Sequence, residues 1–569
     1  MFIKTNRAVY KNKISISKLL CESYWEDGIS KTRTVMNLSK LPTLQQLAIE
    51  QSLKDKGPKV YIEEIKLTRG IDYGYAAVIL ELMKKLRITE TLNKVCKKEA
   101  GLVMLMILGK IVTKGSKLCI VNWIKRNELI AQKIGIDIAN LNEKHLYVAL
   151  GDLDNLQKKI EHKWGIYHKK KLKSIYLYDI TSFYFEGTEN ELSKKGYDRD
   201  KKKGNKDIVT AGLITNEEGF PLKVEVFEGN MLDFKTVENQ ISKIKSDFNV
   251  DEIIFVGDRG MRMRYNLDNM TDDAKTGVKY ISGLTTDEIK KLEKDEVIQL
   301  SFFDKELVEI EDGNKRYILC VNPILEQEKK AKRAERKLKF EVELAALQSA
   351  YNKKSERCEN NKKRIASGDK NKKLKTQLTP KEINSWQYRL RKAQEKYKMQ
   401  NTYKVTITQD KFNIEYDAAY YEKSSQYDGK YVFETTVSKE ILTTNDVRDT
   451  YKKLQEVEHA FRDMKTDKLQ TRPIYHRLAA QTRGHIFVSM FAYVIIQELE
   501  KKIFPWLRED TQKKEKLSIK DIFEELKMIK LCVLSFGKNI HNEIKTTELT
   551  QTQKKIFELL NIKEEILTI

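Results

Sequence analysis

The spacing of apolar residues changes several times along this chain, and each change predicts a different kind of structure. Residues 14–38 alternate between apolar and polar positions on both sides of an Asp-Gly pair, which is typical of tight hairpin turns. From residue 72 to about 170 the apolar positions recur at helical spacing instead. We therefore expect a small β-hairpin module over residues 1–65 and a helical region over residues 66–170.

At residue 174 short β-branched and aromatic runs replace the helical spacing. A turn sequence separates the second and third of these runs, so the first three predict an antiparallel meander. The order of strand, strand, strand, helix and strand is the outline of an RNase H-like fold. The expected strands lie at 174–187, 208–215, 222–227, 253–258 and 278–283, and the expected helix lies at 233–248.

Residues 285–440 depart from that outline and are interpreted as an insertion. Segment 324–400 is rich in Lys and Glu, and two apolar stripes of helical spacing predict a helical hairpin there. Thr379 to Glu382 have the sequence of a capping box with Pro at the first helical position. The two stripes can pack on each other or on another subunit. Residues 402–437 return to a β pattern.

Helical spacing returns over residues 441–500, with one helix expected from about Asn445 to Lys465 and an apolar helix, 484–499, expected to cover the sheet. The Lys-rich residues 501–569 are expected to be helical. The sequence thus predicts a multidomain α+β fold with an RNase H-like catalytic core, a mixed sheet with helices. The core would have two parts, 171–284 and 441–500, separated by the long insertion.

The charge of the chain favours a polyanionic partner. The 569 residues include 106 Lys and Arg against 83 Asp and Glu, a formal net charge of +23. Nucleic acid is the first candidate for such a surface, and the helical region 66–170 is either a DNA-binding module or a plain helical bundle. The six cysteines lack the spacing of a zinc or redox motif. No signal sequence or membrane-spanning run is evident, so a cytoplasmic protein is expected.

Three acidic residues stand in contexts that suggest chemistry. Asp179 and Asp258 each lie on an apolar run that predicts a buried strand. Glu458 lies on the expected helix, with Arg462 one turn later and Lys465 two turns later. Carboxylates from two strands and a helix can hold two divalent cations, which clamp the attacking and leaving oxygens of a phosphodiester. This pattern suggests an enzyme that cuts and joins DNA.

Four segments in order resemble the DDE transposases of bacterial insertion sequences, in the IS4-like group and closest to the IS1634 family. They are Tyr-Asp-Ile-Thr-Ser-Phe-Tyr-Phe-Glu-Gly around Asp179, Gly-Asn-Met-Leu-Asp-Phe-Lys-Thr at 229–236, Val-Gly-Asp-Arg-Gly-Met around Asp258, and the segment 451–465. The resemblance implies that Asp179, Asp258 and Glu458 are the catalytic acids and the metal ligands. Mg²⁺ is the implied cofactor, for which Mn²⁺ can substitute. In the segment 229–236 we interpret Asp233 as a helix N-cap in preference to a DNA contact.

The family's signature around the third acid is Tyr, two residues, Arg, three residues, Glu, six residues, Lys. Tyr451, Glu458 and Lys465 fit this signature, but Leu454 stands at the Arg position. By resemblance Tyr451 and Lys465 would contact DNA, and Lys453 or Arg462 would replace the missing Arg. The alternatives are a core aromatic at Tyr451 and a surface lysine at Lys465. Glu456 is an alternative to Glu458 as the third acid.

The resemblance implies a transposase that binds the terminal inverted repeats of its element, hydrolyses the strands at the ends and joins the 3′-hydroxyls to target DNA. It also implies a homodimer in the synaptic complex and a place near the bacterial nucleoid. Two alternatives remain: a metal-dependent DNA nuclease without strand transfer, and a non-catalytic regulatory DNA-binding protein. Inverted repeats beside the gene would favour transposition.

Overall fold

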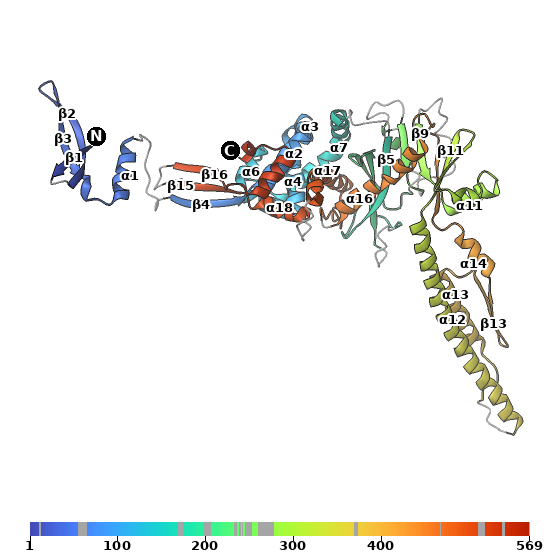
Figure 1. The fold of residues 1–569 in the computed structure, drawn as a ribbon. Coiled ribbons are helices and arrows are strands. Elements are labelled where there is room, and N and C mark those ends of the chain that lie inside the picture. The colour runs from blue at the N-terminus through green and yellow to red at the C-terminus, as the bar shows by residue number, and fades with distance from the viewer. Residues whose placement is uncertain are drawn as a thin grey trace. The chain divides into compact units, whose positions relative to one another are not determined.

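The structure, a computed structural model, divides the chain into two compact units. The first comprises residues 1–81 and 499–569, and the second residues 82–498. Figure 1 labels the helices and strands of the two units. The described residues are 1–10, 13–54, 65–168, 175–197, 206–232, 236–237, 240–241, 243–244, 253–259, 278–368, 374–466, 468–509, 518–536 and 541–567.

The first unit contains the expected hairpin, β2 (Lys13–Glu26) and β3 (Ile29–Asn37). Asp27 and Gly28 form its turn with φ values of 52° and 76°. Positive φ at both central residues is what a tight hairpin turn of the type I′ kind requires, so this part of the prediction is confirmed. The structure adds β1 (Phe2–Tyr10), paired with β2, and the helix α1 (Thr43–Lys54).

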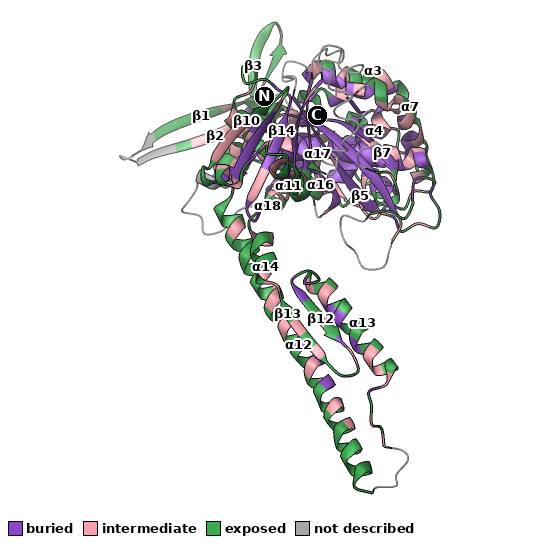
Figure 2. Cartoon of the chain, turned by 90° about the vertical axis from the view of Figure 1, so that its right-hand side faces the viewer, coloured by how far each residue is buried: buried purple, intermediate pink, exposed green. Residues whose placement is uncertain are grey.

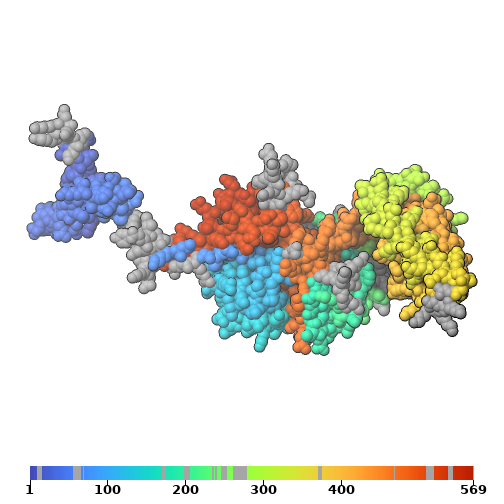
Figure 3. All heavy atoms as spheres, turned by 90° about the horizontal axis from the view of Figure 1, so that it is seen from below, coloured from blue at the N-terminus to red at the C-terminus, as the bar shows by residue number. Residues whose placement is uncertain are grey.

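A second sheet of this unit joins segments from the two ends of the chain. β15 (Lys530–Phe536) pairs with β16 (His541–Thr546) on one side and with β4 (Ile65–Asp72) on the other. In Figure 3 the blue β4 lies against the red C-terminal residues. The expectation of a wholly helical region over 501–569 is therefore wrong. Its helices are α18 (Ile519–Lys527) and α19 (Gln551–Leu559), and the strands depend on a partner some 460 residues earlier, at Ile71↔Leu531.

The region between residues 74 and 168 is helical, as the apolar spacing predicts. In the second unit, Trp164 of this helical region is fully buried and packs against Phe220 and Phe491. The helices are α2 (Gly74–Lys85), α3 (Ile88–Cys96), α4 (Ala100–Val112), α5 (Lys117–Lys125), α6 (Glu128–Lys133) and α7 (Glu143–His168).

A mixed sheet of eight strands forms the core of the second unit, in the order β10-β11-β14-β9-β8-β5-β6-β7. The expected meander is present, with β5 antiparallel to β6 and β6 antiparallel to β7. Every residue of β6 is buried, which indicates that both faces of the sheet are covered there, and Figure 2 shows the central strands in purple. These five strands are β5 (Ile175–Tyr184), β6 (Ile208–Asn216), β7 (Pro221–Glu228), β8 (Ile253–Gly257) and β9 (Val278–Gly283).

Three strands of the sheet come from the segment that the sequence assigns to the insertion. They are β10 (Leu307–Asp312), β11 (Lys315–Val321) and β14 (Lys430–Thr435). β14 pairs with β9, so residues of the insertion continue the sheet beyond the expected core. The helix α11 (Thr286–Lys294) packs against β14.

Two helices lie where the sequence predicts a helical hairpin, α12 (Pro323–Ala366) and α13 (Pro380–Tyr397). Thr379 and Glu382 form the expected capping box. The two apolar stripes bury residues in one shared cluster, which the strands β12 (Tyr403–Ile407) and β13 (Phe412–Tyr416) complete. Figure 2 shows the largely exposed outer surface of this pair. The two stripes thus pack on each other and on these strands. The short helix α14 (Ala418–Ser425) follows β13.

The expected helix 445–465 is two helices, α15 (Thr444–Lys452) and α16 (Leu454–Lys465), with a break at Lys453. The apolar helix is longer than expected, α17 (Ala479–Glu509). Of the helix expected at 233–248, Val237, Ile241 and Ile244 are described and buried. Asp233 and Phe234 lie outside the described residues.

Two further expectations concern the whole chain. None of the helices that the structure describes is long and apolar enough to cross a membrane. All six cysteines are free thiols.

Candidate active site

The pairing of two strands brings the first two acids together. β5 and β8 are parallel, and their last aligned residues are Tyr178 and Gly257. Asp179 and Asp258 follow these residues directly, so they occupy neighbouring positions on adjacent strands, which lie about 4.8 Å apart in a sheet. Asp179 is half-buried and Asp258 is exposed. Two acidic residues that are far apart in sequence thus lie on neighbouring central strands, at the carboxyl end of β8.

Tyr451, near the end of α15, contacts the second of these acids. Its hydroxyl donates a hydrogen bond to Oδ1 of Asp258 over 3.2 Å. The ring packs on Phe433 of β14 with centroids 4.4 Å apart, and a side chain at Gly283 would clash with the Tyr451 hydroxyl. Burial and the neighbouring Asp258 carboxylate raise the pKa of Tyr451, so the phenol keeps the proton that it donates. The alternative of a core aromatic is therefore half right, since the ring is packed while the hydroxyl faces the acid.

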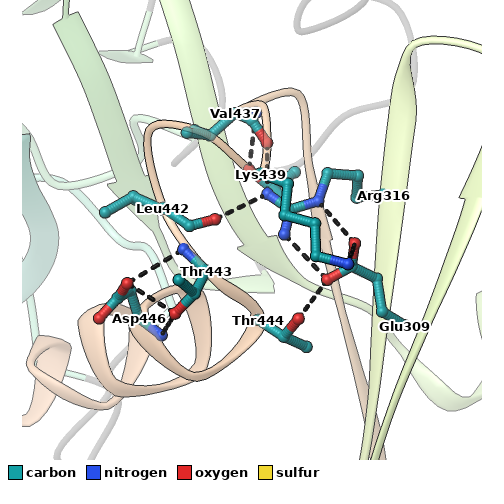
Figure 4. Close-up of polar contacts among 9 residues, drawn as sticks. Glu309, Arg316, Val437, Lys439, Leu442, Thr443, Thr444 and Asp446 are labelled. Carbon is teal, nitrogen blue, oxygen red and sulfur yellow. Dashed lines mark hydrogen bonds and ion pairs between the residues drawn. The ribbon is translucent and has the colours of Figure 1, made fainter.

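A buried polar network fixes the beginning of α15 on the strands from the insertion (Figure 4). Arg316 of β11 donates to the backbone oxygens of Val437 and Leu442 over 2.6 and 3.0 Å. Its Nε and Nη2 donate to the two oxygens of Glu309 over 3.2 and 2.9 Å, and Thr444 donates to the same carboxylate. Burial by itself would raise the pKa of Glu309, but these hydrogen bonds outweigh burial and lower it.

Lys465, the last residue of α16, lies against the strand that carries Asp179. Its Nζ donates to Oγ1 of Thr181 over 2.5 Å and lies 5.4 Å from the centre of the Phe183 ring. Thr181 and Phe183 share a face of β5 with Asp179, because side chains alternate along a strand. Lys465 is only 7% exposed, so it is not the surface lysine that the sequence left as an alternative.

Glu458 lies midway along the chain between the two contacts, seven residues after Tyr451 and seven before Lys465. It shares a helix face with Lys465 and is exposed. Glu456 points elsewhere, because its Cβ lies over Gly219 in the turn between β6 and β7. Asn216, at that turn, pairs with Tyr176 near the beginning of β5, whereas Lys465 contacts Thr181 further along. The beginning of α16 thus lies near the beginning of β5, and its end lies near Thr181. Of the two glutamates, Glu458 is therefore the one further along α16 toward the end that lies beside Asp179 and Thr181.

The remaining basic candidates lie at different places. Arg462 is exposed on α16, one turn after Glu458. Lys453, at the break between α15 and α16, lines a pocket of about 490 Å³ with Ile175 and Ile254, which lie near the beginnings of β5 and β8. Strand pairing and hydrogen bonds thus bring Asp179, Asp258, Tyr451 and Lys465 into one region, whereas Lys453 lies toward the opposite ends of the strands.

The donor set suits a hard divalent cation. Mg²⁺ prefers oxygen ligands and is commonly held by one or two carboxylates together with substrate phosphates. Asp179 and Asp258 supply two such carboxylates on adjacent strands. Across the described residues, no three His, Cys, Asp or Glu side chains are grouped closely enough to hold an ion. The aspartate pair therefore offers two oxygen ligands to a cation, and Glu458 is not grouped with both of them in the part of the chain that the structure describes.

Sequence reasoning missed the residues that support this site. Tyr178, next to Asp179, donates to Oγ1 of Thr236 over 2.9 Å, and Thr236 is the last residue of the Gly-Asn-x-x-Asp-x-x-Thr segment. Arg316 and Glu309 lie more than 100 residues before α15. The motif segment was the one available signal for Thr236, and none pointed to Arg316.

Comparison with known proteins identifies the family. A family model described as "Transposase DDE domain" matches residues 170–495, more than half of the chain, including Asp179, Asp258 and Glu458. No curated protein matches the chain. One similar solved structure is a cryo-EM structure of the piggyBac transposase synaptic complex with hairpin DNA, with 7% identity and a TM-score of 0.34 over 80% of this chain and 77% of that chain. By the match of the family model, the chain belongs to the transposases with a DDE domain and is a DDE transposase.

Proposed function

We propose that this transposase serves a bacterial insertion sequence of the IS4-like group, closest to the IS1634 family. It would bind the terminal inverted repeats, hydrolyse the DNA strands at the element ends and join the 3′-hydroxyls to target DNA. The observation that carries the proposal is the parallel register of β5 and β8, which sets Asp179 beside Asp258. The catalytic core would be the RNase H-like fold expected from the order of its strands.

Asp179, Asp258 and Glu458 are the proposed catalytic acids and metal ligands. Their oxygens would hold Mg²⁺, or Mn²⁺ in its place, because hard cations prefer carboxylates. Bound cations would stabilise the charge that develops on the attacking and leaving oxygens of a phosphodiester. Glu458 is the preferred third acid because α15 and α16 are held on the sheet by Tyr451 on one side of it and Lys465 on the other.

Four residues around the acids would position the substrate. Tyr451 orients the Asp258 carboxylate through its hydroxyl, which leaves the second oxygen of that carboxylate for other partners. Lys465 places a positive charge beside β5, where it favours a phosphate near Asp179. Arg462 and Lys453 are exposed cations that would contact the DNA backbone on either side of Glu458.

Double-stranded DNA is the proposed partner, as element ends and as target. The net charge of +23 supports binding to a polyanion. The β-sheet of β1–β3 and the helices between residues 74 and 168 are the proposed modules for recognising the repeats. A homodimer would hold two ends in one synaptic complex, within the cytoplasm and near the nucleoid.

The test is a cleavage and strand-transfer assay with Mg²⁺ on DNA that carries the element's own ends. Asp179→Asn, Asp258→Asn and Glu458→Gln should each slow cleavage by about 1,000-fold or more, since the lost cation stabilisation amounts to several kcal/mol. DNA affinity should stay within about threefold, because most of the affinity comes from contacts to phosphates elsewhere.

Glu456→Gln is the matched control, since it removes a carboxylate two residues from Glu458 on the same helix. Cleavage at wild-type rate in this variant and loss in Glu458→Gln would support the assignment, and the reverse result would overturn it. Cleavage without joined products would favour the nuclease alternative. Specific DNA binding by folded wild-type protein with no cleavage would favour the regulatory alternative.

A further inference from the structure

A second region of the same unit holds basic side chains in a cavity. This cavity has a volume of about 1120 Å³ and is lined by residues from α4, α5, α7, α17 and the loop 470–478. Its volume slightly exceeds the usual range for ligand pockets, about 300–1,000 Å³, so it admits a group as large as a nucleotide. We call it the basic cavity.

Two lysines of the basic cavity are buried, which is rare for this residue type unless it is paired. Lys110 on α4 is 4% exposed and Lys117 on α5 is 5% exposed. Nζ of Lys110 donates to the backbone oxygen of Gln470 over 3.2 Å. Lys117 has neither a hydrogen bond nor an ion pair with any residue that the structure describes.

Further polar groups of the cavity wall also lack partners. The Thr471 hydroxyl and Nδ1 of His485 are buried, with no hydrogen-bond partner among the described residues. Nε2 of His485 faces the backbone oxygen of Thr471 at 3.1 Å. Buried polar groups are usually satisfied, so a cluster of unsatisfied ones beside an unpaired lysine points to a ligand.

The local electrostatics favour an anion as that ligand. The amino end of α5 opens on the cavity through Gly115 and Ser116, and a helix amino end carries partial positive charge. Burial lowers the pKa of Lys110 to about 7 and that of Lys117 to about 8. The positive charge of Lys117 contributes to the lower pKa of Lys110. The acids of the lining, Glu189 and Glu191, are exposed, and Glu189 pairs with Arg477 at 3.4 Å.

The cavity wall is joined to the strand that carries Asp179. Ile474, in the loop 470–478, donates to the oxygen of Tyr184 over 3.0 Å and accepts from Glu186 over 3.0 Å. Tyr184 lies five residues after Asp179 on β5, a distance of about 17 Å along a strand. That equals the rise of about five nucleotides of a DNA strand, so one strand can reach both places.

We propose that the basic cavity binds a phosphate group, with Lys117 as its main cation and Lys110, Thr471 and the amino end of α5 as further donors. Resting on the proposed function, the phosphate belongs to a DNA strand whose cleaved bond lies at Asp179 and Asp258. A phosphate bound there would be the counterion for the two buried lysines.

The test measures binding of inorganic phosphate to the full-length protein by titration calorimetry. Wild type should show one saturable site, and Lys117→Met should weaken it at least tenfold. Lys125→Met, at the exposed far end of the same helix, is the matched control and should bind phosphate within twofold of wild type. Lys117→Met should fold, with an unchanged or higher melting temperature, because it removes an uncompensated buried charge.

Thr471→Val provides a second variant if Lys117→Met does not fold, and it should weaken phosphate binding severalfold. Wild-type protein that binds no phosphate, or a folded Lys117→Met that binds it as wild type does, would overturn the proposal.

Two tetranucleotides, with a 5′-phosphate and with a 5′-hydroxyl, distinguish the sources of the phosphate. Tighter binding of the first indicates a strand end, equal binding indicates an internal phosphodiester, and binding of inorganic phosphate alone indicates the free ion. The first two results support a phosphate of a DNA strand, and the third supports the phosphate site but overturns its assignment to DNA. Asp258→Asn should bind phosphate normally, so a failure of the proposed DNA cleavage and a failure of this site are separate results.

Discussion

The carboxylate site and the basic cavity handle charge in opposite ways. Asp258 and Glu458 are exposed, and the helices beside them are held by satisfied contacts such as those of Tyr451 and Arg316. In the basic cavity Lys110 and Lys117 are themselves buried, and Lys117 has no partner among the described residues. Exposed carboxylates stay hydrated, so they cost little folding free energy when no cation is bound. Buried lysine ammonium groups lose their hydration and destabilise the folded state unless an anion binds. The difference indicates that the carboxylate site depends on the positions of its side chains, whereas the basic cavity depends on the binding of a negative charge.

The largest effect should come from breaking the support of the carboxylate site. Arg316→Met removes a buried guanidinium from the Glu309 carboxylate and from the loop before α15, and should lower the free energy of unfolding by about 3 kcal/mol. Denaturant unfolding measures this change. Phosphate binding in the basic cavity should stay within twofold, because no described contact of Arg316 reaches it.

Lys439→Met is the control for Arg316→Met, since Lys439 is an exposed partner of the same carboxylate at 3.8 Å. It should change the free energy of unfolding by less than about 0.5 kcal/mol. Equal effects of the two substitutions would show that the buried network does not hold α15.

A smaller loss should follow from Tyr451→Phe, which keeps the packed ring and removes the hydrogen bond to Asp258. A hydrogen bond to a charged group contributes about 1.5 kcal/mol or more, so single-turnover cleavage should slow by about tenfold. Tyr431→Phe on β14, whose ring packs on Phe433 from another position, is the control and should cleave at the wild-type rate. Wild-type cleavage by Tyr451→Phe would mean that Asp258 is oriented by other groups.

The buried lysines of the basic cavity should change how the free energy of unfolding depends on pH. The pKa values of about 7 for Lys110 and about 8 for Lys117 lie below the ordinary 10.5, so between these values the unfolded chain binds more protons than the folded one. The free energy of unfolding should therefore rise with pH from about 7 to about 10. Each lysine contributes at most about 1.4 kcal/mol per pH unit.

The measurement compares wild type with the double variant Lys110→Met and Lys117→Met. His476 and His485 also face this cavity, but burial holds the pKa of His476 at about 3 and that of His485 well below its usual value, so both stay neutral across this range. The melting temperature of wild type should climb more steeply between pH 7 and pH 9. Parallel curves would contradict buried, pKa-shifted lysines.

The smallest effect should come from the exposed cations Arg462 and Lys453. Replacing either by Gln should weaken DNA binding by about two- to fivefold and reduce the slope of log affinity against log salt by about 0.9, as expected for one lost phosphate contact. An unchanged slope would place that residue outside the DNA interface. Since Lys453 lies toward the beginnings of the strands, the pair also tests how far along α16 the DNA extends.

Local patterns in the sequence determined the elements. The Asp-Gly turn, the β-branched and aromatic runs of β5 to β7 and the capping box at Thr379 each involve residues within a few positions of one another, and each appears where it was expected. The candidate acids could also be named, because their flanking residues resemble a family whose model matches this chain. Periodicity and turn chemistry are short-range properties, which is why the sequence reveals them.

Tertiary structure decided what these elements do together. The register of β5 with β8, the strands that the insertion adds to the sheet and the pairing of β4 with β15 all join segments far apart in sequence. Burial of Lys465 against Thr181 and of Lys117 in the basic cavity could not be foreseen, since a lysine in an isolated sequence has the pattern of a solvated charge. Pairing and burial depend on long-range contacts that only the folded chain forms, so the sequence named the acids and the fold supplied their geometry.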